Sequence, residues 1–294
     1  MFPYFCYTAI FILGAFIGSF LNVIIYRLHT KEPIVKARSH CPHCGHILEW
    51  YELVPIFSFL IQKGKCRRCK HRISMQYPLV EGAGGILFLM VVVFNFPAIW
   101  QDFGWALEFS IFTKLLAFQF LNILYLWAVL SMMIVIFAYD LKHYIIPDKI
   151  LYPAIILVIC YKLFDFWSFI NWDLSGISNL EFEVLKPLLY SFLAAAGALA
   201  FFLSIFLITK GRGLGFGDVK FAFFMGFFLG WPSIIVGLFG AWVLGAIIGI
   251  ALLMTGKKVL KSEIPFGPFL VTGTFTAMFW GDEIIKWYFG LLGF

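Results

Sequence analysis

The sequence predicts an all-α polytopic membrane protein with about eight transmembrane helices and a small polar domain between the first and the second. Hydrophobic residues make up 62% of the 294-residue chain and charged residues only 13%, about half the charged fraction of a soluble domain. Eight apolar stretches indicate the membrane helices. They fall at about 4–26, 79–99, 115–138, 150–170, 187–208, 219–232, 233–255 and 265–292.

The first stretch, 4–26, is expected to be a membrane anchor and not a cleaved signal peptide. It has no basic start, it is longer than the apolar region of a signal peptide, and it runs into Arg27 instead of a cleavage site. Only Gly230-Trp231-Pro232 separates the sixth and seventh stretches, so a turn signal defines their boundary.

Lysine and arginine residues predict the orientation of the helices. If the N-terminus lies outside and eight helices alternate, 18 of the 22 basic residues fall on the inner side. The net charge of +6 is therefore interpreted as orientation in the membrane, and we expect no nucleic-acid partner. The same topology puts the polar interval 29–76, Asp140 and Asp218 on the cytoplasmic side.

This topology divides the chain into three expected parts. They are a first transmembrane helix at 1–28, a cytosolic domain at 29–76 and a transmembrane bundle at 77–294. The middle part is too short to build a large hydrophobic core, so it requires a covalent or metal cross-link.

Four cysteines provide such a cross-link. Cys41 and Cys44 form one C-x2-C pair, Cys66 and Cys69 form another, and 21 residues separate the two pairs. Two such pairs can close a tetrahedral thiolate site around Zn²⁺. The alternative is two disulfides, which are rare in a reducing cytoplasm. We therefore predict a structural zinc site, with all four ligands supplied by the protein.

Asp140 and Asp218 lie at the edges of long apolar runs. A carboxylate at membrane depth costs at least about 2.5 kcal/mol, so it is rare and usually functional. Two carboxylates that share a proton are suited to hydrolysis, because one activates water and the other donates a proton. Gly215 and Gly217 precede Asp218 and leave room for a second backbone to approach. The alternative is that both are ordinary acids solvated at the interface.

Asp148 and Lys220 are expected to support the aspartate pair. Asp148 follows Pro147, a combination that is typical of a helix start, so it is either a capping residue or a direct participant. Lys220 lies two residues after Asp218 and so does not share its helical face. We predict a structural or phosphate-facing role for Lys220.

Several motifs occur in order along almost the whole chain, and together they are specific. They are Gly18-Ser-Phe-Leu-Asn22, Ser39-His-Cys41-Pro-His-Cys44, Trp50-Tyr-Glu52-Leu-Val-Pro55, Gly64-Lys-Cys66-Arg-Arg-Cys69, Tyr77-Pro78-Leu-Val-Glu81, Asp140-Leu-Lys-His-Tyr-Ile-Ile-Pro-Asp148, Gly213-Leu-Gly-Phe-Gly-Asp218-Val-Lys220 and Ile264-Pro-Phe-Gly-Pro-Phe269. In these motifs the chain resembles the type IV prepilin leader peptidase family.

The resemblance implies a bifunctional enzyme of the bacterial cytoplasmic membrane. Such an enzyme removes the basic leader of prepilins and pseudopilins after a glycine, with Asp140 and Asp218 as the catalytic pair. It then methylates the new N-terminal residue with S-adenosylmethionine. The resemblance also assigns the four cysteines to the zinc-binding domain of bacterial members.

The binding site for S-adenosylmethionine has no glycine-rich fingerprint in this sequence. The candidates are Glu81, Asn22 and Arg27. Each has a simpler alternative: an ion pair for Glu81, a helix–helix hydrogen bond for Asn22, and a positively charged anchor at the membrane surface for Arg27.

Two other readings of the aspartate pair are possible. A presenilin or signal-peptide-peptidase type of intramembrane protease uses similar short motifs around its two aspartates, but the cysteine domain argues against it. A proton-coupled transporter would carry its acids near the bilayer midplane and show repeated halves, and no repeat is evident.

Overall fold

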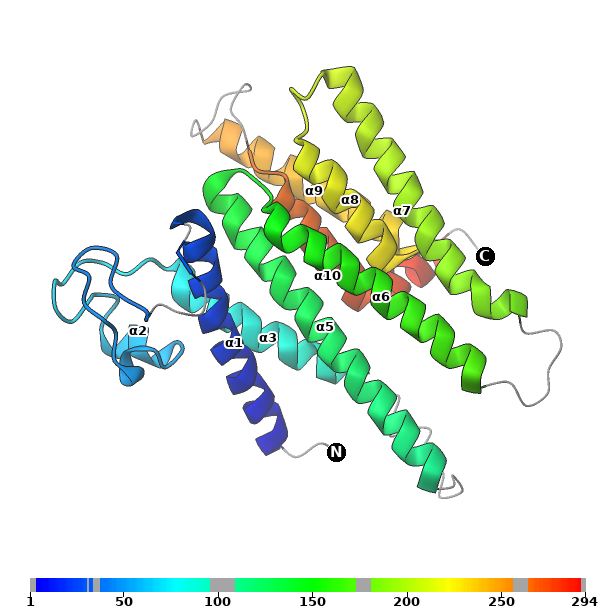
Figure 1. The fold of residues 1–294 in the computed structure, drawn as a ribbon. Coiled ribbons are helices and arrows are strands. Elements are labelled where there is room, and N and C mark those ends of the chain that lie inside the picture. Colours follow the sequence, from blue (N-terminus) through cyan, green and yellow to red (C-terminus); the bar gives the residue numbers. More distant parts are fainter. Residues whose placement is uncertain are drawn as a thin grey trace. The chain divides into compact units, whose positions relative to one another are not determined.

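The structure is a computed structural model that describes residues 4–30, 32–33, 38–95, 109–172, 181–255 and 264–291. Each of the eight predicted apolar stretches corresponds to one helix, although 230–232, 255 and 265–266 lie outside the helices, and the described residues contain no β-strand, only two isolated β-bridges. The predicted all-α class is therefore confirmed. The helices, drawn in Figure 1, are α1 (Tyr4–Thr30), α2 (Phe57–Ile61), α3 (Gln76–Asn95), α5 (Phe109–His143), α6 (Asp148–Trp172), α7 (Glu181–Thr209), α8 (Phe216–Leu229), α9 (Ser233–Met254) and α10 (Gly267–Leu291), with one 3-10 turn, η1 (Trp50–Glu52).

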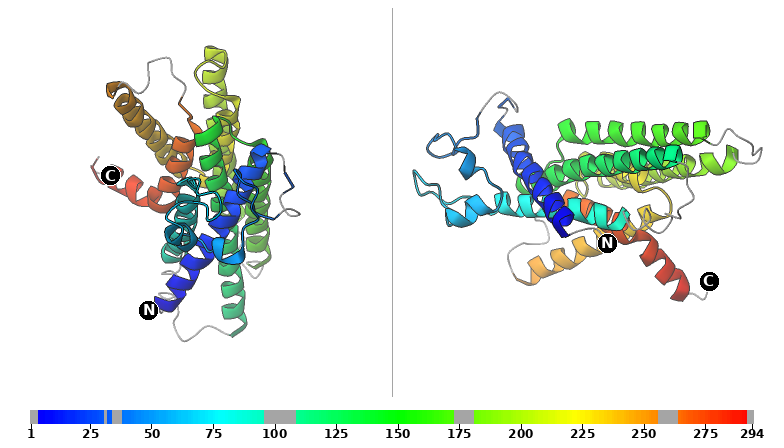
Figure 2. Two further views of the ribbon diagram at one scale, coloured as in Figure 1. Left: turned by 90° about the vertical axis from the view of Figure 1, so that its left-hand side faces the viewer. Right: turned by 90° about the horizontal axis from the view of Figure 1, so that it is seen from below.

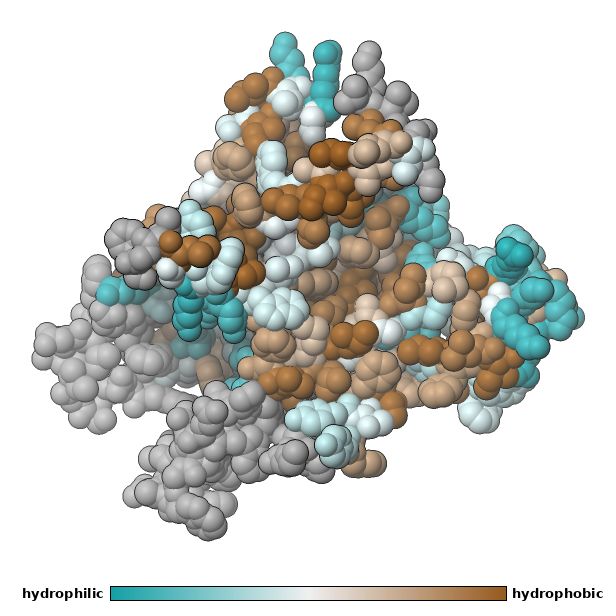
Figure 3. All heavy atoms as spheres, turned by 180° about the vertical axis from the view of Figure 1, so that it is seen from behind, coloured by the Kyte–Doolittle hydropathy of each residue, from teal (hydrophilic) through white to brown (hydrophobic). Residues whose placement is uncertain are grey.

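Six helices in the described part of the chain, α1, α3, α5, α6, α7 and α9, are long and apolar enough to cross a membrane. The remaining two predicted spans correspond to α8 and α10. Helix α8 has 14 residues, which is shorter than the about 20 needed to cross the hydrocarbon core. Figure 3 shows one face of the molecule, on which apolar side chains extend over much of the helical surface. Such a surface suits contact with lipid.

The chain divides into two compact units, Met1–Ala138 and Tyr139–Phe294, and the division lies inside α5. In the first unit α1 packs against α3, and the cysteine-containing segment lies between these helices in sequence. In the second unit α7 packs along α8 and α9 along α10, while α6 contacts both α7 and α8 (Figure 2).

Glycines bring the backbones of α1 and α3 together. A Cβ atom placed on Gly14 would lie 2.5 Å from the carbonyl oxygen of Gly84, and one on Gly18 would lie 2.7 Å from the Cα atom of Glu81. Helices in a membrane gain little from apolar burial, so close packing of small residues contributes much of their association. These glycines therefore hold the first unit together.

The same principle operates in the second unit. A Cβ atom on Gly226 of α8 would lie 2.6 Å from the Cα atom of Ala195 on α7, and one on Gly273 of α10 would collide with the backbone of Gly237 on α9. Each main helix pair of this unit thus meets at a glycine.

Two alanine substitutions on α3 test this packing. Gly84→Ala is expected to lower the stability of the protein by about 1–3 kcal/mol, because the new methyl group forces the two backbones apart. Gly82→Ala is the matched control, since nothing lies within 4 Å of its Cβ position. The measurement is the thermal unfolding midpoint in detergent, and equal midpoints for the two variants would contradict the packing argument.

Candidate active site and metal site

Two buried aspartates lie at helix ends in the second unit. Asp140 is in the last turn of α5 and is 4% exposed, and Asp218 is in the first turn of α8 and is 8% exposed. Their carboxyl groups are close enough to interact electrostatically.

Each aspartate accepts a hydrogen bond from a glycine backbone. The Gly215 N–H donates to Oδ2 of Asp218 over 3.0 Å, and the Gly267 N–H donates to the carboxyl group of Asp140. Gly215 is the N-cap of α8 and its backbone is extended. An acidic side chain in the first turn of a helix is also favoured by the helix dipole. The backbone thus orients both carboxyl groups.

The side chain of Ile146 packs between two glycines of the site. A Cβ atom on Gly217 would lie 3.2 Å from Cβ of Ile146, and one on Gly267 would lie 3.3 Å from its Cγ1 atom. Ile146 belongs to the loop between α5 and α6, and its side chain is buried. The end of α5 and the starts of α8 and α10 therefore converge around one loop.

Asp148 and Lys220 form an ion pair that connects the start of α6 to α8. The Lys220 ammonium group also lies 5.2 Å from the ring centre of Tyr152 and 5.5 Å from that of Phe216. This ion pair was not predicted from the sequence. The position of Asp148 after Pro147 indicated either a helix cap or a direct role beside the aspartate pair. Asp148 is the first residue of α6, as predicted.

The four cysteines form a compact group in the first unit. The sulfur atoms of Cys41, Cys44, Cys66 and Cys69 all lie within 4.8 Å of one another, and those of Cys41 and Cys69 are 3.9 Å apart. Zn–S bonds of about 2.3 Å in a tetrahedron put the sulfur atoms about 3.8 Å apart. The donor set and its geometry therefore fit a metal ion.

The backbone around each cysteine pair supports ligand binding. The Cys41 N–H donates to the His46 carbonyl, and the Cys66 N–H donates to the His71 carbonyl, each over 2.9 Å. These bonds close two similar turns that direct the thiols inward. Hydrogen bonds from the backbone, chiefly of Cys69, lower the pKa of the Cys66 thiol to about 7 and so favour its thiolate form, whereas desolvation and the neighbouring thiols raise the pKa of the Cys69 thiol to about 11.

Glu52 is a buried acid that links the two cysteine turns. Its carboxyl oxygens lie 3.4 Å from Nε2 of His46 and 4.0 Å from Nε of Arg67. It also accepts a hydrogen bond from the Glu49 backbone over 3.0 Å. The sequence did not indicate this role, because the partners lie on both sides of Glu52 in the chain and only the folded structure brings them together.

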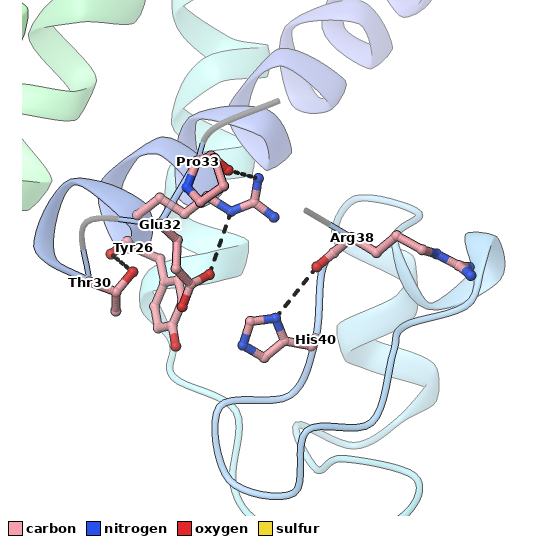
Figure 4. Close-up of polar contacts among 7 residues, drawn as sticks. Tyr26, Thr30, Glu32, Pro33, Arg38 and His40 are labelled. Atoms are coloured by element: carbon pink, nitrogen blue, oxygen red, sulfur yellow. Dashed lines mark hydrogen bonds and ion pairs between the residues drawn. The ribbon is translucent and has the colours of Figure 1, made fainter. Parts of the chain in front are cut away.

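The three candidates for the S-adenosylmethionine site all make contacts within the first unit. Asn22 donates to the Tyr77 carbonyl over 3.1 Å, and Glu81 accepts from the Ile56 N–H over 2.7 Å. The Arg27 guanidinium group donates to the Pro33 carbonyl over 3.0 Å and lies 4.0 Å from the Glu32 carboxyl group, and Figure 4 labels these two partners. Arg27 is buried and so is not simply a surface anchor.

Two family models match this chain. Residues 12–95 match the bacterial peptidase A24 N-terminal domain, which covers the cysteine group, and residues 127–250 match the type IV leader peptidase family, which covers both aspartates. No solved structure matches.

Curated relatives match along nearly the whole chain. A protein of Legionella pneumophila called prepilin leader peptidase/N-methyltransferase is 31% identical, and the match covers 98% of this chain and 96% of the relative. A protein of Bacillus subtilis with the same description is 30% identical, and the match covers 96% of this chain and 97% of the relative. The relative of the same description in Pseudomonas putida is 29% identical, over 99% and 96%. The chain therefore belongs to the type IV leader peptidase family.

Proposed function

We propose that this protein cleaves the basic leader from type IV prepilins and related pseudopilins, C-terminal to a glycine, and that Asp140 and Asp218 are its catalytic residues. The observation that carries the proposal is the pair of buried, interacting carboxyl groups, each held by one backbone N–H. The relatives' description as prepilin leader peptidases supports the choice of substrate.

The chemistry requires the two carboxyl groups to be in different protonation states. The ionised group removes a proton from water as the water oxygen attacks the scissile carbonyl, and the protonated group donates to the carbonyl oxygen. The tetrahedral intermediate then collapses, and a carboxyl proton passes to the leaving amine. The Gly215 and Gly267 N–H groups keep the two carboxyl groups oriented through these steps.

The location of the pair suits a substrate that is itself embedded in the membrane. A prepilin has a basic leader followed by an apolar helix, so its scissile bond rests near the membrane surface. The distribution of lysine and arginine supports an orientation with the N-terminus outside and the aspartates and cysteines on the cytoplasmic side of the bacterial inner membrane. Water is available at that depth.

We further propose that the protein methylates the new N-terminal residue of the cleaved pilin. The support is the description of the relatives as N-methyltransferases. S-adenosylmethionine would supply the methyl group. Because Asn22, Arg27 and Glu81 are engaged in contacts within the protein, we assign none of them to the methyl donor.

The metal that fits the cysteine group best is Zn²⁺ in a structural role. Four thiolates satisfy its tetrahedral preference and leave no position open for a substrate. The ion would join two turns that are also connected by Glu52 and by the adjacent rings of His43 and His71.

Substitution of either aspartate is expected to abolish cleavage. Asp140→Asn and Asp218→Asn keep the shape of the side chain but remove an acid, so the rate of leader removal should fall by about 10²–10⁴-fold or more. The measurement is leader loss from a purified prepilin in detergent, read by mass spectrometry. Full cleavage by either variant would rule out the proposed pair.

The same two variants test whether methylation is a separate activity. Supplied with a pilin that has already lost its leader, each variant is expected to add one methyl group at the rate of the unmodified enzyme. Methylation that fails together with cleavage would show that the aspartates serve both reactions.

Elemental analysis tests the metal. The purified protein is expected to contain about one Zn²⁺ per chain, and Cys66→Ser to lose it, because three thiolates bind zinc much more weakly than four. Cys160→Ser is the control, since Cys160 lies on α6 outside the group. Protein that is purified without chelator and contains no zinc would overturn the assignment.

A further inference from the structure

Gly267 occupies a position in which no side chain can be accommodated without moving Asp140. A Cβ atom on Gly267 would lie 2.5 Å from Oδ2 of Asp140 and 3.0 Å from its Cγ atom. The Asp140 carboxyl group thus fills the space that a residue with a side chain would need. Gly267 itself is buried at the start of α10.

The start of α10 leaves the Gly267 N–H free of the helix. The first hydrogen bonds of α10 run from the Phe269 and Leu270 N–H groups to the Phe266 carbonyl, so the Gly267 N–H has no partner inside the helix. The Asp140 carboxyl group lies beside this end of α10, with Oδ2 2.5 Å from the Cβ position of Gly267. The positive end of the helix dipole favours an acidic group at this place.

We propose that Gly267 is a positioning residue for Asp140, which it orients through its backbone N–H and through the absence of a side chain. The proposal rests on the proposed peptidase function. It extends the active site to α10, which begins within the Ile264-Pro-Phe-Gly-Pro-Phe269 motif.

Gly267→Ala is the decisive variant. The three atoms nearest to the methyl group belong to the side chains of Asp140 and Ile146 and not to the backbone, so the protein should fold while kcat for leader cleavage falls by about 100-fold. The KM for the prepilin should stay within about twofold, because the substrate contacts are unchanged. If the wild-type enzyme cleaves prepilin and Gly267→Ala has the same kcat, this inference alone is refuted. If the wild-type enzyme cleaves no prepilin, the proposed function is refuted.

Two other glycines provide controls. Gly273→Ala on the same helix collides with the Gly237 backbone and should lower the unfolding temperature, whereas Gly249→Ala meets nothing within 4 Å and should change neither stability nor kcat. If Gly267→Ala does not fold, glycolic acid introduced at 267 replaces the N–H with an ester oxygen and adds no side chain. That protein should lose about tenfold in kcat, and an unchanged kcat would refute the proposal.

A second and independent inference concerns α2. This short helix carries three large apolar side chains on one face: Phe57, Leu60 and Ile61 are 65%, 63% and 70% exposed. Six basic residues follow within ten positions: Lys63, Lys65, Arg67, Arg68, Lys70 and Arg72. An exposed apolar face beside a basic run matches the interfacial region of an anionic membrane.

A hydrogen bond sets the depth of α2 relative to α3. Ile56, immediately before α2, donates its N–H to Glu81 of α3 over 2.7 Å. Glu81 lies five residues after Gln76, about 7.5 Å along the helix axis. Ile56 has φ 62°, which is rare for a β-branched residue, so this contact holds a strained backbone. The start of α2 is therefore fixed beside the first turns of a membrane helix.

We infer that α2 lies in the surface of the membrane that α1 and α3 cross, with Phe57, Leu60 and Ile61 inserted among anionic phospholipids. The full-length protein in nanodiscs of phosphatidylglycerol and phosphatidylethanolamine tests this. A benzophenone amino acid at Ile61 should label phospholipid about fivefold more than the same probe at Glu49, which is exposed and lies outside both the apolar face and the basic run.

Equal labelling of lipid at both positions, or none at Ile61, would overturn this inference. Labelling of an added prepilin by the Ile61 probe in place of lipid would show that the face binds protein, and would overturn it as well. Neither result would bear on Gly267, because the two inferences concern different units.

Discussion

Every buried carboxyl group in the described part of this protein is held by a backbone N–H. Glu52 accepts from Glu49, Glu81 from Ile56, Asp140 from Gly267 and Asp218 from Gly215. In an apolar surrounding, an acid without a donor is costly, and basic side chains are scarce inside the bundle. The backbone can supply N–H groups only where helices begin or turns interrupt them, so these acids lie beside such breaks.

This constraint determines the form of the proposed active site. Both aspartates sit where the helical hydrogen-bond pattern is incomplete, and both donors are glycines. A glycine brings its N–H close to a carboxyl group without a side chain in the way. Glycines also allow α1 to meet α3, α7 to meet α8, and α9 to meet α10. Small residues thus serve both the packing of the bundle and the arrangement of its acids.

Membership of the type IV leader peptidase family argues against the two other readings of the aspartate pair. A presenilin-type protease would not carry the cysteine group, which coincides with the matched N-terminal domain. A transporter would need acids near the centre of the membrane helices, whereas Asp140 lies in the last turn of α5 and Asp218 in the first turn of α8.

The sequence by itself determined the helical class, the eight helical stretches and the pairing of the cysteine motifs, because hydrophobic runs and short-range spacing are local properties. It also singled out Asp140 and Asp218, since charge beside an apolar run is visible without coordinates. Only the tertiary structure decided which groups meet: Gly267 with Asp140, Asp148 with Lys220, and Ile56 with Glu81. These partners lie on different helices and loops, and contacts between distant segments depend on packing that no local pattern encodes.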